Sequence, residues 1–212
     1  MTMPINSTAK VALIRLFTLF TISCLLSFQL NAKPLDNIQR AIFAGGCFWC
    51  MEPPFDALEG VISTTSGYIG GQVKNPTYKQ VSSGTTGHTE ALEIVYNPDK
   101  ISYQQLLSTF WLNIDPVDRG GQFCDRGSQY RSEIFYTTNQ QYQQATQSKL
   151  QLDARDVLPA PVHTPISPAT EFFPAEAYHQ NYYQRNPKRY QFYSWNCGRK
   201  QRLLQLWGKT YD

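Results

Sequence analysis

The stretch that decides the fold and the chemistry of this chain is Arg40-Ala-Ile-Phe-Ala-Gly-Gly-Cys-Phe-Trp-Cys50. Its first half is a short apolar run that ends at two glycines, which predicts a buried strand followed by a tight turn. Residues 48–58 then predict a short helix, made irregular by two prolines. The two cysteines therefore stand where a strand turns into a helix.

This position favours a reactive thiol at Cys47. Free amide groups and the dipole at a helix start stabilise a thiolate, so we expect a lowered pKa for Cys47 and a nucleophile near neutral pH. Cys50 follows about one helical turn later, within reach of whatever forms on Cys47. Two other interpretations stay open. The cysteines could be structural, either as a Cys47–Cys50 bridge or as a pair of buried apolar thiols, or they could belong to a zinc site. The zinc site would draw on Cys47, Cys50, Cys124, Cys197, His88, His163 and His179, although no second C-x-x-C or paired H-x₃₋₅-H accompanies them.

The rest of the chain alternates strand and helix patterns. Further strands are predicted at 61–68, 89–96, 131–137 and 162–166, and further helices at 102–113, 140–153, 175–183 and 199–207. Two polar stretches, 72–87 and 115–130, are predicted as loops, and long loops inside a compact domain are often functional. The alternation predicts a mixed α/β domain, while the strand order does not follow from it.

The first 32 residues have a different character from the rest. Lys10 and Arg15 precede or enter an apolar run over 16–30, which predicts a secretory signal peptide and a periplasmic location. A membrane anchor is the alternative, although the run is short for a membrane span. We therefore expect one mature domain over residues 33–212.

Composition narrows the function of that domain. The chain has 212 residues, of which 42% are hydrophobic and 14% aromatic, which excludes a disordered class. Without the two basic residues of the signal, the formal charge falls from +3 to 3 − 2 = +1. A nearly neutral domain with no Lys/Arg block is not expected to bind nucleic acid.

Several segments accompany the cysteine motif in a fixed order. Gly46-Cys-Phe-Trp-Cys50 is followed by Ser66-Gly-Tyr-Ile-Gly-Gly71, Asn75-Pro-Thr-Tyr78, Thr86-Gly-His-Thr-Glu90, Val95-Tyr-Asn-Pro98, Gly127-Ser-Gln-Tyr-Arg-Ser132 and Glu176-Ala-Tyr-His-Gln180. From about residue 39 to residue 207 this series resembles the A-type peptide methionine sulfoxide reductases. The resemblance implies a two-layer α/β sandwich with a ferredoxin-like core and long coil excursions. It also implies reduction of the S epimer of methionine sulfoxide in proteins or peptides.

The resemblance implies roles for four residues that touch the sulfoxide. Cys47 would attack the sulfoxide sulfur, and Glu90 would protonate the oxygen as its bond to sulfur breaks. An acid that faces apolar aromatics should have a raised pKa and stay protonated. Tyr78 and Tyr130 would hydrogen-bond the sulfoxide oxygen. On its own, Glu90 would be interpreted as an exposed strand carboxylate, and either tyrosine as packing.

Three further residues are implied to line the same pocket. Phe48 and Trp49 would form an apolar slot for the terminal methyl of the substrate, and Asp125 would be a polar wall. Because methyl and oxygen meet different walls, such a pocket distinguishes the two sulfur epimers.

A second thiol must condense with the Cys47 sulfenic acid to form an intramolecular disulfide. Cys50 is favoured over Cys197, because the segment after Cys197 looks more helical than the flexible tail expected for a mobile thiol. Cys124 is expected to be a buried or pocket-rim thiol. An external dithiol, thioredoxin or a thioredoxin-like periplasmic donor, would then reopen the disulfide. We expect no metal or organic cofactor, and a monomer.

Two rival functions remain on the residues. An exported thiol–disulfide oxidoreductase would also use a C-x-x-C after a strand, but it gives Glu90 and the tyrosines no reason to converge. A binding module is the alternative that is not an enzyme. It would use a tyrosine-rich surface formed by Tyr178, Tyr182, Tyr183, Tyr190 and Tyr193, a cluster that packing across a helix explains at least as well.

Overall fold

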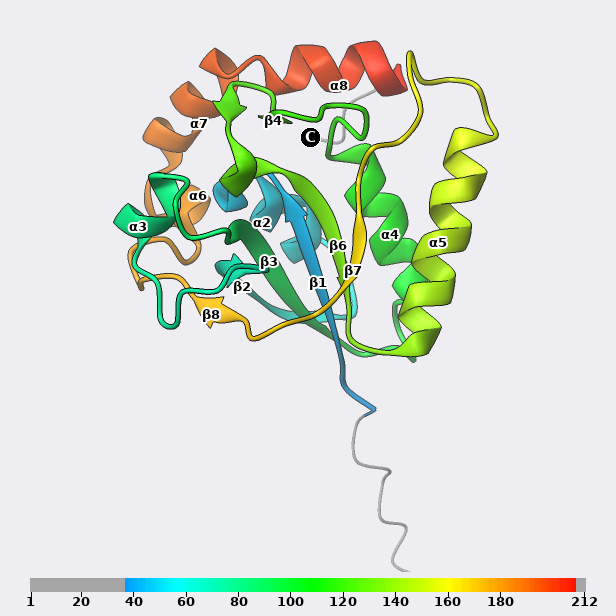
Figure 1. The fold of residues 1–212 in the computed structure, drawn as a ribbon, viewed down its shortest axis with the longest axis horizontal. Helices are drawn as coiled ribbons and strands as arrows, with labels where there is room; N and C mark the ends of the chain where they lie inside the picture. Colours follow the sequence, from blue (N-terminus) through cyan, green and yellow to red (C-terminus); the bar gives the residue numbers. More distant parts are fainter. Residues whose placement is uncertain (1–36, 209–212) are drawn as a thin grey trace, which may run out of the picture. The chain divides into compact units, whose positions relative to one another are not determined.

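The computed structural model describes residues 37–208, so the signal peptide predicted for residues 1–32 lies outside the described residues. A six-stranded sheet, in the order β7-β6-β1-β3-β2-β8, forms the centre of this part (Figure 1). Its strands are β1 (Gln39–Gly45), β2 (Val61–Ile69), β3 (Thr89–Tyr96), β6 (Ser132–Tyr136), β7 (Ile166–Pro168) and β8 (Phe173–Pro174). A separate two-stranded ribbon consists of β4 (Gly121–Gln122) and β5 (Asp125–Arg126).

The helices vary from single turns to a fifteen-residue α5. They are α2 (Phe48–Asp56), α3 (Tyr78–Ser82), α4 (Tyr103–Leu112), the 3₁₀ helix η1 (Ser128–Tyr130), α5 (Asn139–Asp153), α6 (Tyr182–Arg185), α7 (Pro187–Asn196) and α8 (Arg199–Trp207). Across residues 37–208, none combines the length and the apolar character that a membrane crossing requires.

The expected ferredoxin-like core is confirmed. The elements β1, α2, β2, β3, α4 and β6 follow one another along the chain, and the four strands pair antiparallel in the order β6-β1-β3-β2. Strand β7 adds parallel to β6, and β8 adds antiparallel to β2. The result is a mixed sheet with β1 and β3 at its centre. Strand β1 leads into the cysteine motif, and β3 carries Glu90.

Helices cover one face of this sheet and coil covers much of the other. On the helical face, apolar residues of β1, β3 and β6 pack against α2, α4 and α5, with Phe43 stacked on Phe110 at 5.0 Å between ring centroids. On the opposite face, Ile42 and Phe135 pack with Phe172 of the coil before β8. Strand β1 is therefore buried on both faces, which explains its continuous apolar sequence.

A glycine is required in the turn between β1 and α2. Gly46 has a φ of +82°, and a Cβ at this position would lie 2.6 Å from Cβ of Gln122. The Gln122 side chain accepts from the amide of Asp115 at 2.7 Å and donates to its carbonyl at 2.8 Å. The segment 115–122 is thus fixed directly against the turn that presents Cys47.

The strand predicted at 162–166 is wrong in its bounds. The Val162 amide donates to the Asp153 carboxylate at 2.7 Å and the His163 amide to the Pro116 carbonyl at 2.8 Å. These amides are therefore not available to the sheet, and pairing with β6 begins only at Ile166.

The helix predicted at 175–183 is also wrong. Asn181 adopts a left-handed φ of 52°, and its amide donates to the buried Glu52 carboxylate at 3.0 Å. Residues 177–181 form turns, and the helices here are α6 and α7, the second starting at Pro187. The two predicted loops are not structureless, since 72–87 contains α3 and 115–130 contains β4, β5 and η1.

Candidate active site

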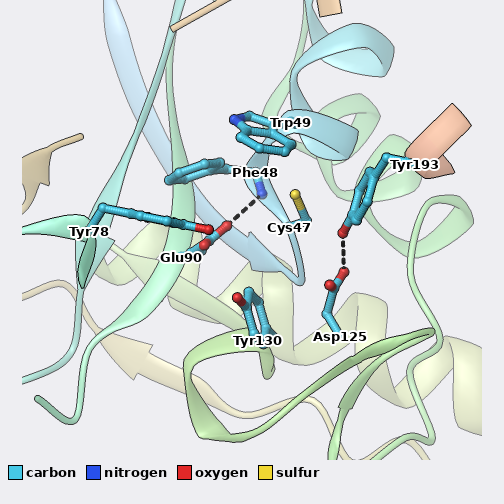
Figure 2. Close-up of a pocket in the computed structure, with 8 residues that line it drawn as sticks. All are labelled: Cys47, Phe48, Trp49, Tyr78, Glu90, Asp125, Tyr130 and Tyr193. Atoms are coloured by element: carbon cyan, nitrogen blue, oxygen red, sulfur yellow. Dashed lines mark hydrogen bonds between the residues drawn. The ribbon is translucent and has the colours of Figure 1, made fainter. Parts of the chain in front are cut away.

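Eight residues from distant parts of the chain surround one small pocket (Figure 2). Its volume is about 70 Å³. A cavity needs about 10–15 Å³ of such space to hold one water molecule, so the pocket has room for a group of several heavy atoms. The lining residues are Cys47, Phe48, Trp49, Tyr78, Glu90, Asp125, Tyr130 and Tyr193.

Cys47 sits at the N-cap of α2, where its side chain makes no capping hydrogen bond. Glu90 supplies that function from β3, since its Oε2 accepts from the Phe48 amide at 3.1 Å. The thiol of Cys47 is left to point into the pocket (Figure 2). One hydrogen bond thus fixes both the helix start and the carboxyl beside the thiol.

The expected lowering of the Cys47 pKa is wrong for this pocket without substrate. Burial raises the pKa of the Cys47 thiol, and Cys50, Glu90 and Asp125 raise it further. The pKa of Cys50 is lowered instead, first by a hydrogen bond from Cys47 and then by the charge of Arg199. The helix start does not offset the desolvation of a thiol that is 7% exposed and lies beside carboxyl groups.

Glu90 is a buried acid in the protonated form. It is 2% exposed, and burial raises its pKa to about 8, against the lowering effect of the Phe48 amide. Asp125 and Cys50 raise the pKa further. At neutral pH the carboxyl therefore carries a proton that it can donate into the pocket.

Two tyrosines face the same space. Tyr78 begins α3 and Tyr130 ends η1, and Figure 2 shows both rings beside Glu90. Burial raises the pKa of Tyr78 to about 12 and raises that of Tyr130 above its usual range, so both hydroxyls stay protonated. They supply neutral hydrogen-bond donors next to the acid.

Aromatic rings form the wall opposite the polar groups. The indole of Trp49 donates to Nδ1 of His179 at 3.1 Å and stacks on Tyr182 at 3.8 Å between ring centroids. Phe48 is 1% exposed and packs on the same histidine at 5.0 Å. Burial lowers the pKa of His179, so this wall is uncharged.

Tyr193 is a pocket residue that no sequence motif indicates. From α7 its hydroxyl donates to Oδ2 of Asp125 at 2.5 Å (Figure 2). Burial raises the pKa of Asp125, with Tyr193 and Arg199 acting in the opposite direction. The chain has thirteen tyrosines, so no local signal distinguishes this one.

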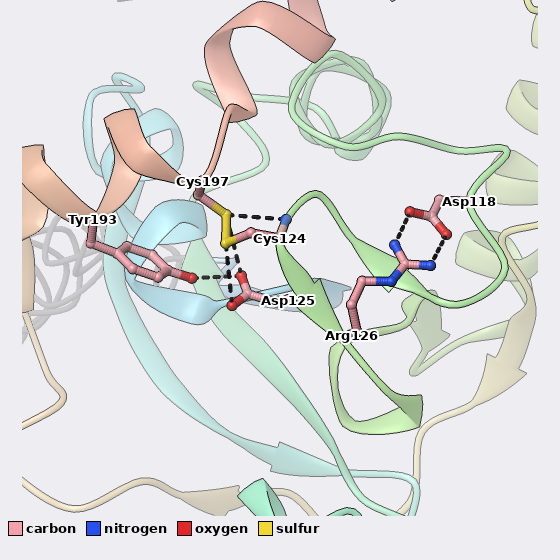
Figure 3. Close-up of a disulfide and its surroundings, with 6 residues drawn as sticks. All are labelled: Asp118, Cys124, Asp125, Arg126, Tyr193 and Cys197. Carbon is pink, nitrogen blue, oxygen red and sulfur yellow. Dashed lines mark hydrogen bonds and ion pairs between the residues drawn. A yellow bond between two sulfur atoms is a disulfide. The ribbon is translucent and has the colours of Figure 1, made fainter.

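The predictions for Cys124 and Cys197 need correction. Cys124 is exposed and forms a disulfide with Cys197, and neither residue lines the pocket (Figure 3). Both sulfurs lie against the Asp125 carboxylate, at 3.8 and 3.9 Å. Because Cys124 and Cys197 are bonded to each other, neither thiol is available as a ligand of the zinc site considered above. The free cysteines of residues 37–208 are Cys47 and Cys50.

Comparison with known proteins identifies the family of the protein that contains this pocket. A family model described as peptide methionine sulfoxide reductase matches residues 39–211. The chain belongs to the peptide methionine sulfoxide reductase family. It is an enzyme of this family, and reduction of methionine sulfoxide is its activity.

Two relatives match this reductase over nearly their whole length. The peptide methionine sulfoxide reductase MsrA of Streptococcus agalactiae is 56% identical over 153 residues, which cover 72% of this chain and 90% of the relative. MsrA of Bacillus licheniformis is 48% identical over 177 residues, covering 84% and 98%. Among solved structures, methionine sulfoxide reductase A of Corynebacterium diphtheriae is 32% identical, with a TM-score of 0.65 over 74% of this chain and 78% of that one.

Proposed function

We propose that this reductase moves the oxygen of the S epimer of methionine sulfoxide onto the Cys47 sulfur. The observation that carries the proposal is the convergence of the Cys47 thiol, the protonated Glu90 and two free hydroxyls on one pocket of about 70 Å³. The oxygen would lie between Glu90, Tyr78 and Tyr130, with the methyl against the aromatic wall.

The chemistry balances with these groups alone. Cys47 attacks the substrate sulfur and forms an S–S bond, while Glu90 donates a proton to the oxygen. The protonated oxygen then moves to the Cys47 sulfur as its bond to the substrate sulfur and the S–S bond break, so that methionine leaves. Cys47 becomes a sulfenic acid, and its thiol proton restores Glu90. The electrons come from the Cys47 sulfur, so each turnover must be completed by thiols.

Cys50 is the thiol we propose for the next step. It lies on the same helix as Cys47, hydrogen-bonds with it and is free, whereas Cys197 is bonded to Cys124. An external dithiol of the thioredoxin type then reduces the Cys47–Cys50 disulfide by exchange.

The proposal also includes the location of the enzyme. We propose that the protein is exported to the periplasm, loses residues 1–32, and repairs exported proteins there as a monomer. Support comes from the basic and apolar pattern of residues 10–30. The Cys124–Cys197 disulfide agrees with an oxidising compartment.

The test is turnover of separate S and R epimers of a peptide methionine sulfoxide with a small dithiol. We expect reduction of the S epimer alone, and its loss in Cys47→Ser and Glu90→Gln. Glu93→Gln is the matched control, because Glu93 lies on the same strand but pairs with Arg40 outside the pocket. Equal reduction of both epimers, or full activity of Glu90→Gln, would reject the proposal.

A further inference from the structure

Arg199 at the start of α8 is a buried cation without an acidic partner. It is 7% exposed, and its guanidinium donates to the Asn113 carbonyl, lies 3.5 Å from the Met51 sulfur and stacks 4.6 Å over the Phe123 ring. None of these groups carries a full negative charge. In the part of the chain that the structure describes, Arg199 forms no ion pair with a carboxylate.

Arg202, one turn later on the same helix, differs from Arg199 in this respect. Arg202 is more exposed and pairs with the Asp115 carboxylate at 2.7 Å. A buried charge is costly unless an opposite charge compensates it. The deeper arginine is the one that has no carboxylate in direct contact, although its charge lowers the pKa of Asp125.

The thiol of Cys50 lies within the field of this cation. Met51, which contacts the guanidinium, follows Cys50 directly in α2, and Arg199 is one of the groups that lower the pKa of Cys50. The groups that shift the pKa of this thiol, or whose pKa it shifts, come from several elements: Cys47, Glu90, Asp125, Tyr190, Tyr193 and Arg199. Arg199 is the one cation among them.

We propose that Arg199 is a positioning residue for the recycling step, holding Cys50 as the thiolate that attacks the oxidised Cys47. This inference rests on the proposed role of Cys50. Before oxidation, the Cys47 S–H also supports a Cys50 thiolate. After oxidation that S–H no longer exists, and Arg199 and the Tyr190 hydroxyl remain as its support.

The step conserves atoms and electrons. A lone pair of the Cys50 thiolate forms the new S–S bond to the Cys47 sulfur, and the S–O bond of the sulfenic acid breaks. The hydroxide that leaves takes up a proton and becomes water. The sulfenic acid supplied by the first step is the only oxidant required.

The experiment measures the two steps separately in the purified protein. Reduced enzyme is mixed with one equivalent of the S sulfoxide at pH 6 to 10, and methionine release and loss of free thiols are followed by rapid quenching with an alkylating reagent. Wild type is compared with Arg199→Met, Arg199→Lys and the matched control Arg202→Met.

We expect Arg199→Met to release methionine at the wild-type rate but to form the disulfide more slowly at pH 7. A more basic thiolate is also a better nucleophile, so a tenfold loss of thiolate slows the step only about threefold. Once the pH is high enough to form the thiolate in both proteins, the variant should be about threefold faster than wild type. Arg199→Lys should restore the wild-type profile.

The outcomes separate this inference from the proposed function. A variant that is slower by the same factor at every pH has a structural defect, which would overturn the role of Arg199. A wild-type profile in Arg199→Met would overturn it as well. If Cys50→Ser still forms a disulfide with Cys47, the proposed recycling thiol is wrong, and that result is independent of Arg199.

Discussion

Replacing Glu90 with glutamine should make the reductase inactive and, at alkaline pH, more stable. Burial raises the pKa of Glu90 from 4.5 to about 8. Between these values the folded chain holds a proton that the unfolded chain has lost, so wild-type stability falls as the pH rises. The slope is about 1.4 kcal/mol per pH unit, or about 5 kcal/mol over the interval.

The glutamine variant lacks this slope because its side chain is neutral at every pH. Its amide oxygen can still accept from the Phe48 amide, which preserves the start of α2. The free energy of unfolding of Glu90→Gln minus that of wild type should therefore rise by about 5 kcal/mol from pH 4.5 to pH 8 and then level off.

Urea unfolding followed by tryptophan fluorescence at pH 4.5, 6 and 8 measures this difference. Glu52 is also buried, with a pKa raised to about 7, but it is present in both proteins and cancels from the comparison. In Glu93→Gln the difference should stay nearly flat, because Glu93 makes a surface ion pair with Arg40. If the difference for Glu90→Gln is constant with pH, Glu90 is ionised in the folded protein and cannot be the acid.

Three further predictions concern the pocket and the Cys124–Cys197 disulfide. Single-turnover rates on the S epimer should fall as the pH rises through about 8, where Glu90 loses its proton, and a flat profile from pH 6 to 10 would exclude Glu90 as the proton donor. Tyr193→Phe removes the donor to the Asp125 carboxylate. It should lower kcat/KM by about ten- to a hundredfold, since a lost hydrogen bond to a charged group costs about 1.5–3 kcal/mol. Unchanged kinetics would show that this bond does not shape the pocket. The double variant Cys124→Ser, Cys197→Ser removes a disulfide between residues 73 positions apart. Its free energy of unfolding in urea should fall by about 2–4 kcal/mol, while dithiol-dependent turnover is kept. Loss of turnover at full stability would place this disulfide in the catalytic cycle.

Much of the fold could be predicted from local signals. Some signals need only a few neighbouring residues. They include the apolar run of β1, the double glycine that ends it and the capping box at Ser102, where α4 begins. The failures occurred where a distant side chain decides the local backbone. The Glu52 carboxylate accepts from the amides of Asn181 and Tyr182, 129 and 130 residues away, and so fixes the start of α6.

The site was predictable only as far as motifs reach. Resemblance identified seven of the eight lining residues. Six of them stand in recognisable segments, and Asp125 lies two residues before one of these segments. Tyr193 lies outside those segments, and its place depends on how α7 packs near Asp125. The partner of Cys197 is equally non-local, since only the folded chain brings Cys124 to a Cα distance of 4.9 Å. The raised pKa of Cys47 depends on burial, and the lowered pKa of Cys50 depends first on the hydrogen bond from Cys47 and then on Arg199. Sequence spacing does not show these effects.

The ends of the central sheet have a consequence for how this enzyme meets other polypeptides. Its outermost strands, β7 and β8, have three and two residues, and each ends in a proline. Proline has no amide hydrogen to offer, and so short a strand presents no row of unpaired backbone groups. An extended client chain therefore has no ladder to join. The enzyme can select one oxidised side chain from its clients without becoming a template for their aggregation.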